Sequence, residues 1–175
     1  MNTALAAPTT GPASHKYPLA PPIDAELWLN TLQPITLESL RDRVIVIEAF
    51  QMLCPGCVAH GLPQAKEIQR HFDSAQVAVL GLHSVFEHHD AMKPVSLRAF
   101  AHENRLTFPI AVDRHDEKSW PLPKTMRAYG LEGTPSLLII DQQGRLRARH
   151  FGHVSDLIVG ATIGDLLASP HSPLA

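Results

Sequence analysis

The sequence predicts an α/β domain built around a central mixed β-sheet flanked by helices. Three short runs of aliphatic and β-branched residues, at 44–50, 77–83 and 136–141, have the length and composition of buried strands. The turn Gln142-Gln143-Gly144 leads from the third run into a further strand at 145–151, which predicts an antiparallel hairpin. The resulting order β-α-β-α-β-β-α is that of the α/β class.

The remaining elements follow from hydrophobic periodicity and from punctuating residues. Pro63 lies inside a helix that should begin at the cysteines and is expected to kink it. The last helix carries Val159, Ile163, Leu166 and Leu167 at i, i+4, i+7 and i+8, which is one core-facing stripe. In chain order we expect a weak strand at 25–30, a helical turn at 36–40, a helix from the cysteines to about Phe72, a helix at 94–104, a short strand at 108–112, a helix at 124–129 and a helix at 155–168.

Length and charge restrict the organisation and the partners. The 175 residues suit one domain. We expect residues 1–22, rich in Pro and Ala, to be a disordered tail, and residues 23–175 to form the domain. A net charge of −2 argues against nucleic-acid binding, and no apolar run reaches the length of about 18 residues typical of a membrane span. No secretory signal is recognisable, so we expect a cytoplasmic protein, or a periplasmic one if a signal has been removed.

The two cysteines, Cys54 and Cys57, form a Cys-Pro-Gly-Cys motif between a buried strand and a helix. A structural zinc site usually needs four Cys or His ligands, and a second pair is missing from the sequence. A thiolate at the start of a helix is stabilised by unpaired N–H groups and by the helix dipole, which would make Cys54 nucleophilic. Cys57, one turn later, could then resolve a mixed disulfide formed at Cys54.

Several landmarks around this motif resemble the thioredoxin superfamily, specifically its TlpA-like and DipZ-like thiol–disulfide branch. Glu48 precedes the first cysteine by six residues, Pro63 follows the second by six, and Tyr129-Gly130-x-x-Gly133-Thr134-Pro135 resembles the cis-proline loop of the family. The resemblance covers roughly residues 24–168. Leu53 stands where the family usually has Trp, and the dipeptide between the cysteines is Pro-Gly rather than Gly-Pro.

The resemblance implies a thioredoxin-like fold and a thiol–disulfide oxidoreductase. Cys54 would attack, Cys57 would resolve, and Glu48, whose apolar neighbours predict burial, would relay protons. Thr134 and Pro135 would bind the partner chain as an added strand. The expected partner is a protein that carries a disulfide or a dithiol, with an unidentified electron donor, and no cofactor or metal is implied.

Two other functions stay open as alternatives. A peroxiredoxin-like thiol peroxidase would carry Pro and Thr or Ser in the pattern P-x-x-x-T/S-x-x-C, where this chain has Ile47 and Gln51. A thioredoxin-like copper or zinc module is the other, and His60 extends the motif to Cys-x-x-Cys-x-x-His. Thioredoxin-like copper carriers resemble C-x-x-x-C instead, so the spacing favours redox chemistry over metal binding.

Overall fold

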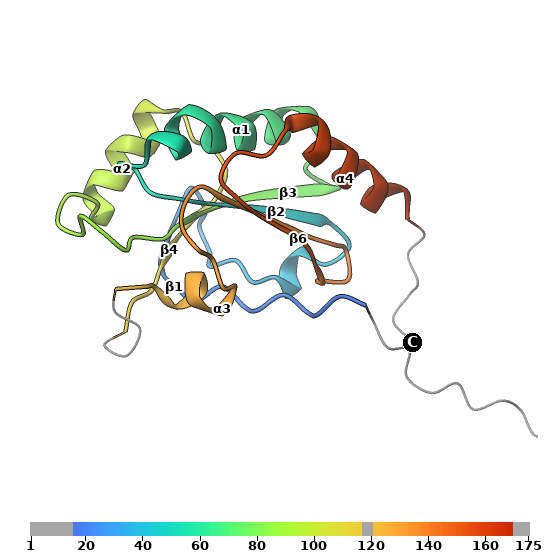
Figure 1. The fold of residues 1–175 in the computed structure, drawn as a ribbon, viewed down its shortest axis with the longest axis horizontal. Coiled ribbons are helices and arrows are strands. Elements are labelled where there is room, and N and C mark those ends of the chain that lie inside the picture. Colours follow the sequence, from blue (N-terminus) through green and yellow to red (C-terminus); the bar gives the residue numbers. More distant parts are fainter. Residues whose placement is uncertain (1–15, 117–120, 170–175) are drawn as a thin grey trace, which may run out of the picture.

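The computed structural model describes residues 16–116 and 121–169, and it confirms the predicted α/β class (Figure 1). The strands are β1 (Ala25–Leu29), β2 (Val44–Phe50), β3 (Val77–His83), β4 (Ile110–Asp113), β5 (Ser136–Ile140) and β6 (Leu146–Phe151). The α-helices are α1 (Leu62–His71), α2 (Pro94–Glu103), α3 (Lys124–Ala128) and α4 (Asp156–Ala168). Among the described helices, none combines the length and the apolar character that a membrane crossing requires.

The strands form one mixed sheet in the order β1-β4-β3-β2-β5-β6. The three central strands β4, β3 and β2 run parallel, whereas β1 and β5 pair antiparallel with β4 and β2, and β6 pairs antiparallel with β5. β2 is therefore bonded on both sides, and Glu48 lies between Gly81 of β3 and Leu137 of β5. The loop that carries the cysteines leaves the carboxyl end of this most enclosed part of the sheet.

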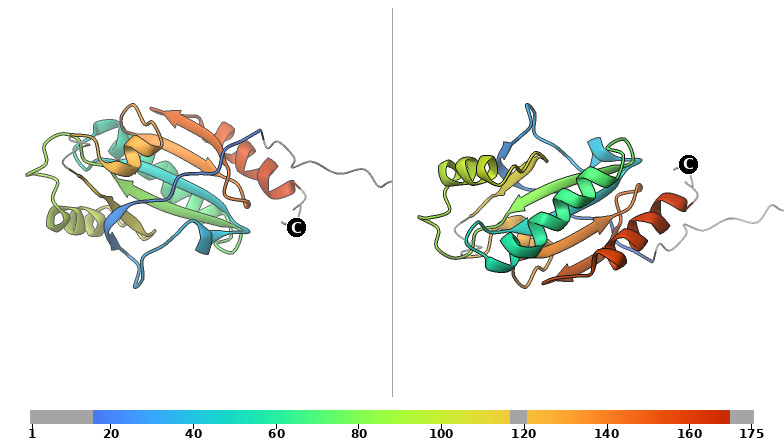
Figure 2. Two further views of the ribbon diagram at one scale, coloured as in Figure 1. Left: turned by 90° about the horizontal axis from the view of Figure 1, so that it is seen from below. Right: turned by 90° about the horizontal axis from the view of Figure 1, so that it is seen from above.

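An apolar layer covers each face of the sheet. α1, α2 and α4 cover one face, and α3 lies on the other (Figures 1 and 2). Successive residues of β2 alternate between the layers: Val44 and Val46 pack with the first group of helices, and Ile45 and Ile47 pack with Met126 of α3 on the opposite face. Burial on both faces explains why β2 and β3 read as continuous apolar runs in the sequence.

The helical segment expected from the cysteines runs over residues 55–71 and contains a π-helical turn. Residues Cys57–Gly61 form a π-helical turn, and α1 begins only at Leu62, with Pro63 in its first turn. The N–H of Leu62 bonds to the carbonyl of Cys57, five residues earlier. Pro63 has no N–H to donate and its ring crowds the preceding turn, so the wider turn accommodates it without breaking the helix.

The short strand expected at 108–112 begins two residues later and ends one residue later, at Ile110–Asp113. Phe108 is buried in the core, and the carbonyl of Pro109 accepts a hydrogen bond of 2.8 Å from the N–H of Gly81. Pro109 itself has no N–H for the ladder. Regular pairing with β3 therefore starts at Ile110.

Part of the predicted tail, residues 18–21, is hydrogen-bonded to the rest of the described structure. The carbonyl of Pro18 accepts the N–H of Leu146 at 3.0 Å, and the N–H of Ala20 donates to Gly144 at 2.9 Å. The hydroxyl of Tyr129 donates to the carbonyl of Pro21 at 2.6 Å. These bonds occupy backbone groups around the β5–β6 turn, so an extended segment without periodicity is still part of the packed domain (Figure 2). Residues 1–15 of the predicted tail lie outside the described residues.

Candidate active site

The two cysteines lie together but in unequal environments. Both are free thiols; Cys54 is partly exposed, whereas Cys57 is fully buried. The Sγ of Cys54 accepts the backbone N–H of Cys57 at 3.2 Å, and its thiol donates to the carbonyl of Thr134 at 3.4 Å. The Cys54 sulfur is therefore accessible from the surface, whereas the Cys57 sulfur is not.

The backbone places Cys54 at the entrance of the helical segment. The N–H of Cys54 bonds back to the carbonyl of Gln51, and the carbonyl of Cys54 accepts the N–H of Val58. The first N–H groups of a helix have no partner within the helix, and one of them, that of Cys57, points at the Cys54 sulfur. A thiolate that forms there is held by an N–H donor and by the helix dipole.

Burial makes Cys57 a poor thiolate in this reduced state. Its pKa is raised to about 12, first by burial and then by the hydrogen bond with the Cys54 side chain. Near neutral pH the Cys57 thiol therefore keeps its proton. A reaction in which Cys57 attacks needs a neighbouring group that takes this proton.

Glu48 is buried in the middle of β2, behind the redox pair, with 1% of its surface exposed. Among the described residues, its Oε1 atom has no hydrogen-bond partner. Burial, and secondarily the negative charge that Cys54 can carry, raises the pKa of Glu48 well above its usual range. A buried carboxyl oxygen without a partner is unfavourable for folding.

Gly61 gives this carboxyl its space. A Cβ atom at position 61 would overlap Oε1 of Glu48 and would lie 3.1 Å from the Cβ of Pro135. The missing side chain thus lets the π-helical turn pass directly over the carboxyl group. Glu48, Gly61 and Pro135 form one packed layer beneath the cysteines.

The Thr134–Pro135 loop lies against the redox pair. Its peptide bond is cis, as the resemblance implied. A Cβ atom at Gly56, between the two cysteines, would lie 3.2 Å from the Cδ of Pro135. The structure therefore brings together all five residues proposed from the sequence, which are Cys54, Cys57, Glu48, Thr134 and Pro135.

Gln51 is a further residue of the site that the sequence did not identify as such. It is buried, and its Nε2 lies 3.5 Å from Thr134 Oγ1 and 3.4 Å from Glu87 Oε1. Its Oε1 accepts the N–H of Phe86 at 3.1 Å. The side chain thus ties the loop after β3 to the cis-proline loop. The available signal was a polar residue directly after a wholly apolar strand, three positions before Cys54.

Exposed apolar side chains accompany the accessible cysteine. Leu53 and Val58 flank the redox motif and are exposed, and so is Phe151 at the end of β6. Phe151 lies close to the cis-proline loop, since a Cβ atom at Gly133 would come within 2.8 Å of its ring. We refer to Leu53, Val58 and Phe151 as the apolar rim. Sequence periodicity did not mark these residues, because Phe151 lies far along the chain from Leu53 and Val58.

His60 lies at the surface near the second cysteine. Its ring centroid is 4.8 Å from that of His153, which also is exposed. Within 16–116 and 121–169, no three His, Cys, Asp or Glu side chains are grouped so that they could hold a metal ion. The extended Cys-x-x-Cys-x-x-His pattern therefore does not assemble as a three-ligand group in this structure.

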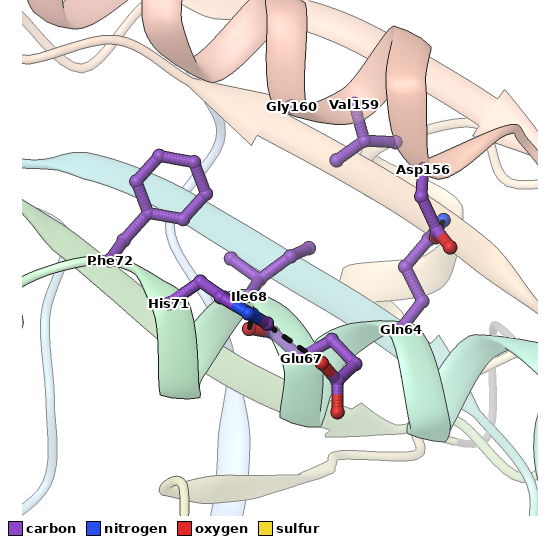
Figure 3. Close-up of a pocket in the computed structure, with 8 residues that line it drawn as sticks. All are labelled: Gln64, Glu67, Ile68, His71, Phe72, Asp156, Val159 and Gly160. Carbon is purple, nitrogen blue, oxygen red and sulfur yellow. Dashed lines mark hydrogen bonds and ion pairs between the residues drawn. The ribbon is translucent and has the colours of Figure 1, made fainter.

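A separate groove of about 240 Å³ lies between α1 and α4 (Figure 3). Its polar side chains are largely engaged with one another: Gln64 donates to Asp156 at 2.6 Å, and Glu67 lies 3.4 Å from His71. It contains neither cysteine. The Cys54 region is accordingly the better candidate for the active site.

The chain is similar to several known proteins. A model of the AhpC/TSA family matches residues 19–149. Protein DipZ of Mycobacterium tuberculosis (strain CDC 1551 / Oshkosh) is 26% identical over 144 residues, which is 79% of this chain and 19% of that protein. Protein DipZ of Mycobacterium bovis matches to the same extent. The chain thus spans about a fifth of the length of these curated relatives.

Two solved structures are more similar. A thioredoxin-like superfamily protein is 54% identical with a TM-score of 0.85, and the match covers 87% of this chain and 97% of that one. A thiol-disulfide isomerase from Corynebacterium glutamicum is 48% identical with a TM-score of 0.84, and the match covers 89% of this chain and 99% of that one. Both support the thioredoxin-like fold that the sequence predicted.

Proposed function

The chain belongs to the AhpC/TSA family and has the fold of thiol–disulfide oxidoreductases, and from this premise we propose that it exchanges dithiol and disulfide with a partner protein through Cys54 and Cys57. The observation that carries the proposal is the inequality of the two thiols. Cys54 is reachable and is hydrogen-bonded to Thr134, whereas Cys57 is buried directly behind it. This arrangement suits one attacking and one resolving cysteine.

In the first step the Cys54 thiolate attacks a disulfide of the partner. A bond forms between Cys54 Sγ and one partner sulfur, and the other partner sulfur leaves as a thiolate that takes up a proton. In the second step Cys57 loses its proton and attacks Cys54 Sγ. The Cys54–Cys57 disulfide forms and the partner leaves as a dithiol; the reverse sequence oxidises a partner dithiol.

Glu48 is the proposed proton acceptor for the second step. The pKa of Cys57 is raised to about 12, so its attack requires a base. The pKa of Glu48 is raised well above its usual range by burial, which makes its carboxylate a stronger base than an exposed one. Gly61 leaves the carboxyl room beneath the redox helix.

The loop at Thr134 and Pro135 is the proposed docking site for the partner chain. The carbonyl of Thr134 already accepts a bond from Cys54, so a strand that pairs with this loop would bring its sulfur next to the nucleophile. The apolar rim supplies a contact that does not depend on one partner sequence, since hydrophobic attraction is non-directional. A disulfide-bearing or dithiol-bearing protein is therefore the proposed substrate.

Trapping with matched serine variants tests the proposal. Cys57→Ser should accumulate a mixed disulfide between Cys54 and an oxidised test protein, because resolution is blocked. Cys54→Ser should form no such adduct, although one cysteine remains. An adduct at Cys57 in the second variant would reverse the roles. Rapid consumption of peroxide by the reduced wild type, without dithiol–disulfide exchange, would support the thiol peroxidase instead.

A further inference from the structure

A second candidate site lies between the end of β1 and the carboxyl end of α2. It is a groove of about 700 Å³, within the range of small-molecule pockets. Trp28 and Asn30 form one side, and Arg98, His102 and Arg105 form the other. None of the residues of the redox site lines it.

The groove is basic. Arg98 and His102 lie at i and i+4 on α2, and Arg105 follows three positions later. Among the described residues, Arg98 and Arg105 make no ion pair, and Glu103, which lies 3.3 Å from His102, does not line the groove. Two guanidinium groups therefore stand beside a half-exposed tryptophan without a counter-charge.

The two sides of the groove are fixed to each other. The side-chain amide of Asn30 donates to the carbonyls of Leu106 at 2.8 Å and Phe108 at 3.0 Å. Asn30 and Arg105 both have left-handed backbone conformations, with φ of 59° and 52°. Asn tolerates this conformation, but at the position after a helix end Gly is the usual residue. An arginine is thus held at a place that disfavours it.

Attraction of cations to the carboxyl end of α2 does not account for this arginine. Lys66 already occupies that end, with its Nζ 3.0 Å from the carbonyl of Asn104, and His102 lies in the last turn. Neither interaction requires a side chain larger than hydrogen at position 105. The arginine is better explained by what its guanidinium can bind in the groove.

We propose that this groove binds a small molecule that carries a phosphate group. Guanidinium groups form paired hydrogen bonds with phosphate oxygens, and two of them on one wall fit a doubly charged anion. The ring of Trp28 offers a flat apolar surface for the remainder of such a molecule. The bonds of Asn30 fix the two sides of the groove to each other, which lowers the backbone ordering that binding would require.

Calorimetric titration of the full chain at low ionic strength tests the proposal. The probes are inorganic phosphate, ribose 5-phosphate and adenosine 5′-monophosphate, with adenosine as the uncharged control. We expect the phosphate-bearing probes to bind and adenosine not to. Arg98→Gln and Arg105→Gly should each weaken binding about tenfold or more, since each removes a charged hydrogen-bond donor. Tighter binding of the nucleotide than of inorganic phosphate would locate its base against Trp28.

Arg70→Gln is the matched control, because Arg70 is an exposed arginine of α1 outside the groove, and this variant should bind like the wild type. Thermal unfolding of each variant shows whether it folds, and Arg105→Gly in particular removes a side chain without opening the core. Absence of binding by all three phosphates would overturn the proposal. So would binding that survives in both groove variants.

Discussion

The redox site and the basic groove use ionisable groups in opposite ways. At the redox site, Glu48 and Cys57 are buried and their protonated forms are favoured. In the groove, Arg98 and Arg105 are exposed and keep their charge in water. Burial favours the protonated forms at the first site, whereas binding at the second would come from charges that a ligand neutralises.

The two regions should therefore differ in the substitutions that they tolerate. Changes around Glu48 alter a low-dielectric site, where removing or adding one charge has a large effect. Changes at Arg98 or Arg105 alter solvated groups, and should leave the fold and the redox step almost unchanged. Four predictions test this difference, beginning with the largest effect.

The rate of alkylation should be higher at Cys54 than at Cys57 by more than three orders of magnitude. Burial raises the pKa of Cys57 to about 12, so its thiol is almost entirely protonated near pH 7.5, and it is fully buried. We therefore expect iodoacetamide to label Cys54 first in the reduced protein, as peptide mass mapping over time would show. Labelling of Cys57 at a comparable rate would mean that the site is not desolvated as described.

Glu48→Gln should slow resolution of the mixed disulfide by up to about a hundredfold, the contribution of a positioned base at its lower end. Attack by Cys54 should change little, because that step does not require the carboxyl to accept a proton. Rapid-quench kinetics with a disulfide substrate separate the two steps. A higher pH should partly restore resolution in the variant, since hydroxide can then deprotonate Cys57. Equal slowing of both steps would indicate a structural role for Glu48.

The same variant should be more stable than the wild type, by an amount that grows with pH. In the unfolded chain a glutamate ionises near pH 4.3, whereas the raised pKa of buried Glu48 keeps it protonated to higher pH. Between these two values the unfolded state binds fewer protons, so wild-type stability falls as pH rises, by at most about 1.4 kcal/mol per pH unit. Glu48→Gln removes this dependence.

Denaturant titrations at several pH values between about 4 and 7 measure this gap. Glu67→Gln is the control, because it should change the stability in the opposite direction. Hydrogen bonding to Arg70 lowers the pKa of the exposed Glu67, so its stabilising effect is present above its unfolded pKa and is lost with the substitution. A gap between Glu48→Gln and the wild type that does not change with pH would show that Glu48 is not titrating in the buried site.

The redox site could be predicted from the sequence better than the groove could. β2 and β3 were predicted to the residue, because burial on both faces leaves an unbroken apolar run in the sequence. Glu48 was recognisable because that run surrounds it. Arg98 and Arg105, by contrast, look like ordinary solvated residues, and the groove joins residues that lie far apart in the sequence, as the bond from Asn30 to Leu106 shows, 76 positions away. The docking of Pro18 and Pro21 was missed for a related reason, since an extended segment has no periodicity.

The smallest predicted effect concerns the two left-handed residues of the groove, which should respond to glycine with opposite signs. At Arg105, glycine relieves backbone strain of about 1 kcal/mol but also loosens the unfolded chain by about 0.4–1 kcal/mol. We expect a net stabilisation between zero and about 0.5 kcal/mol, because the two effects nearly offset each other. Asn30→Gly removes the bonds to Leu106 and Phe108 and should destabilise by about 1–2 kcal/mol.

Denaturant midpoints of both variants, measured together with the rate of disulfide exchange, test this pair. Exchange should be unchanged in Arg105→Gly, because residue 105 does not line the redox site. A loss of more than about 1 kcal/mol in Arg105→Gly would exceed what the backbone can explain, and would mean that the arginine side chain supports the fold. Position 105 would then be a structural position, whereas stability retained together with weaker phosphate binding would leave ligand binding as the reason for arginine at a glycine position.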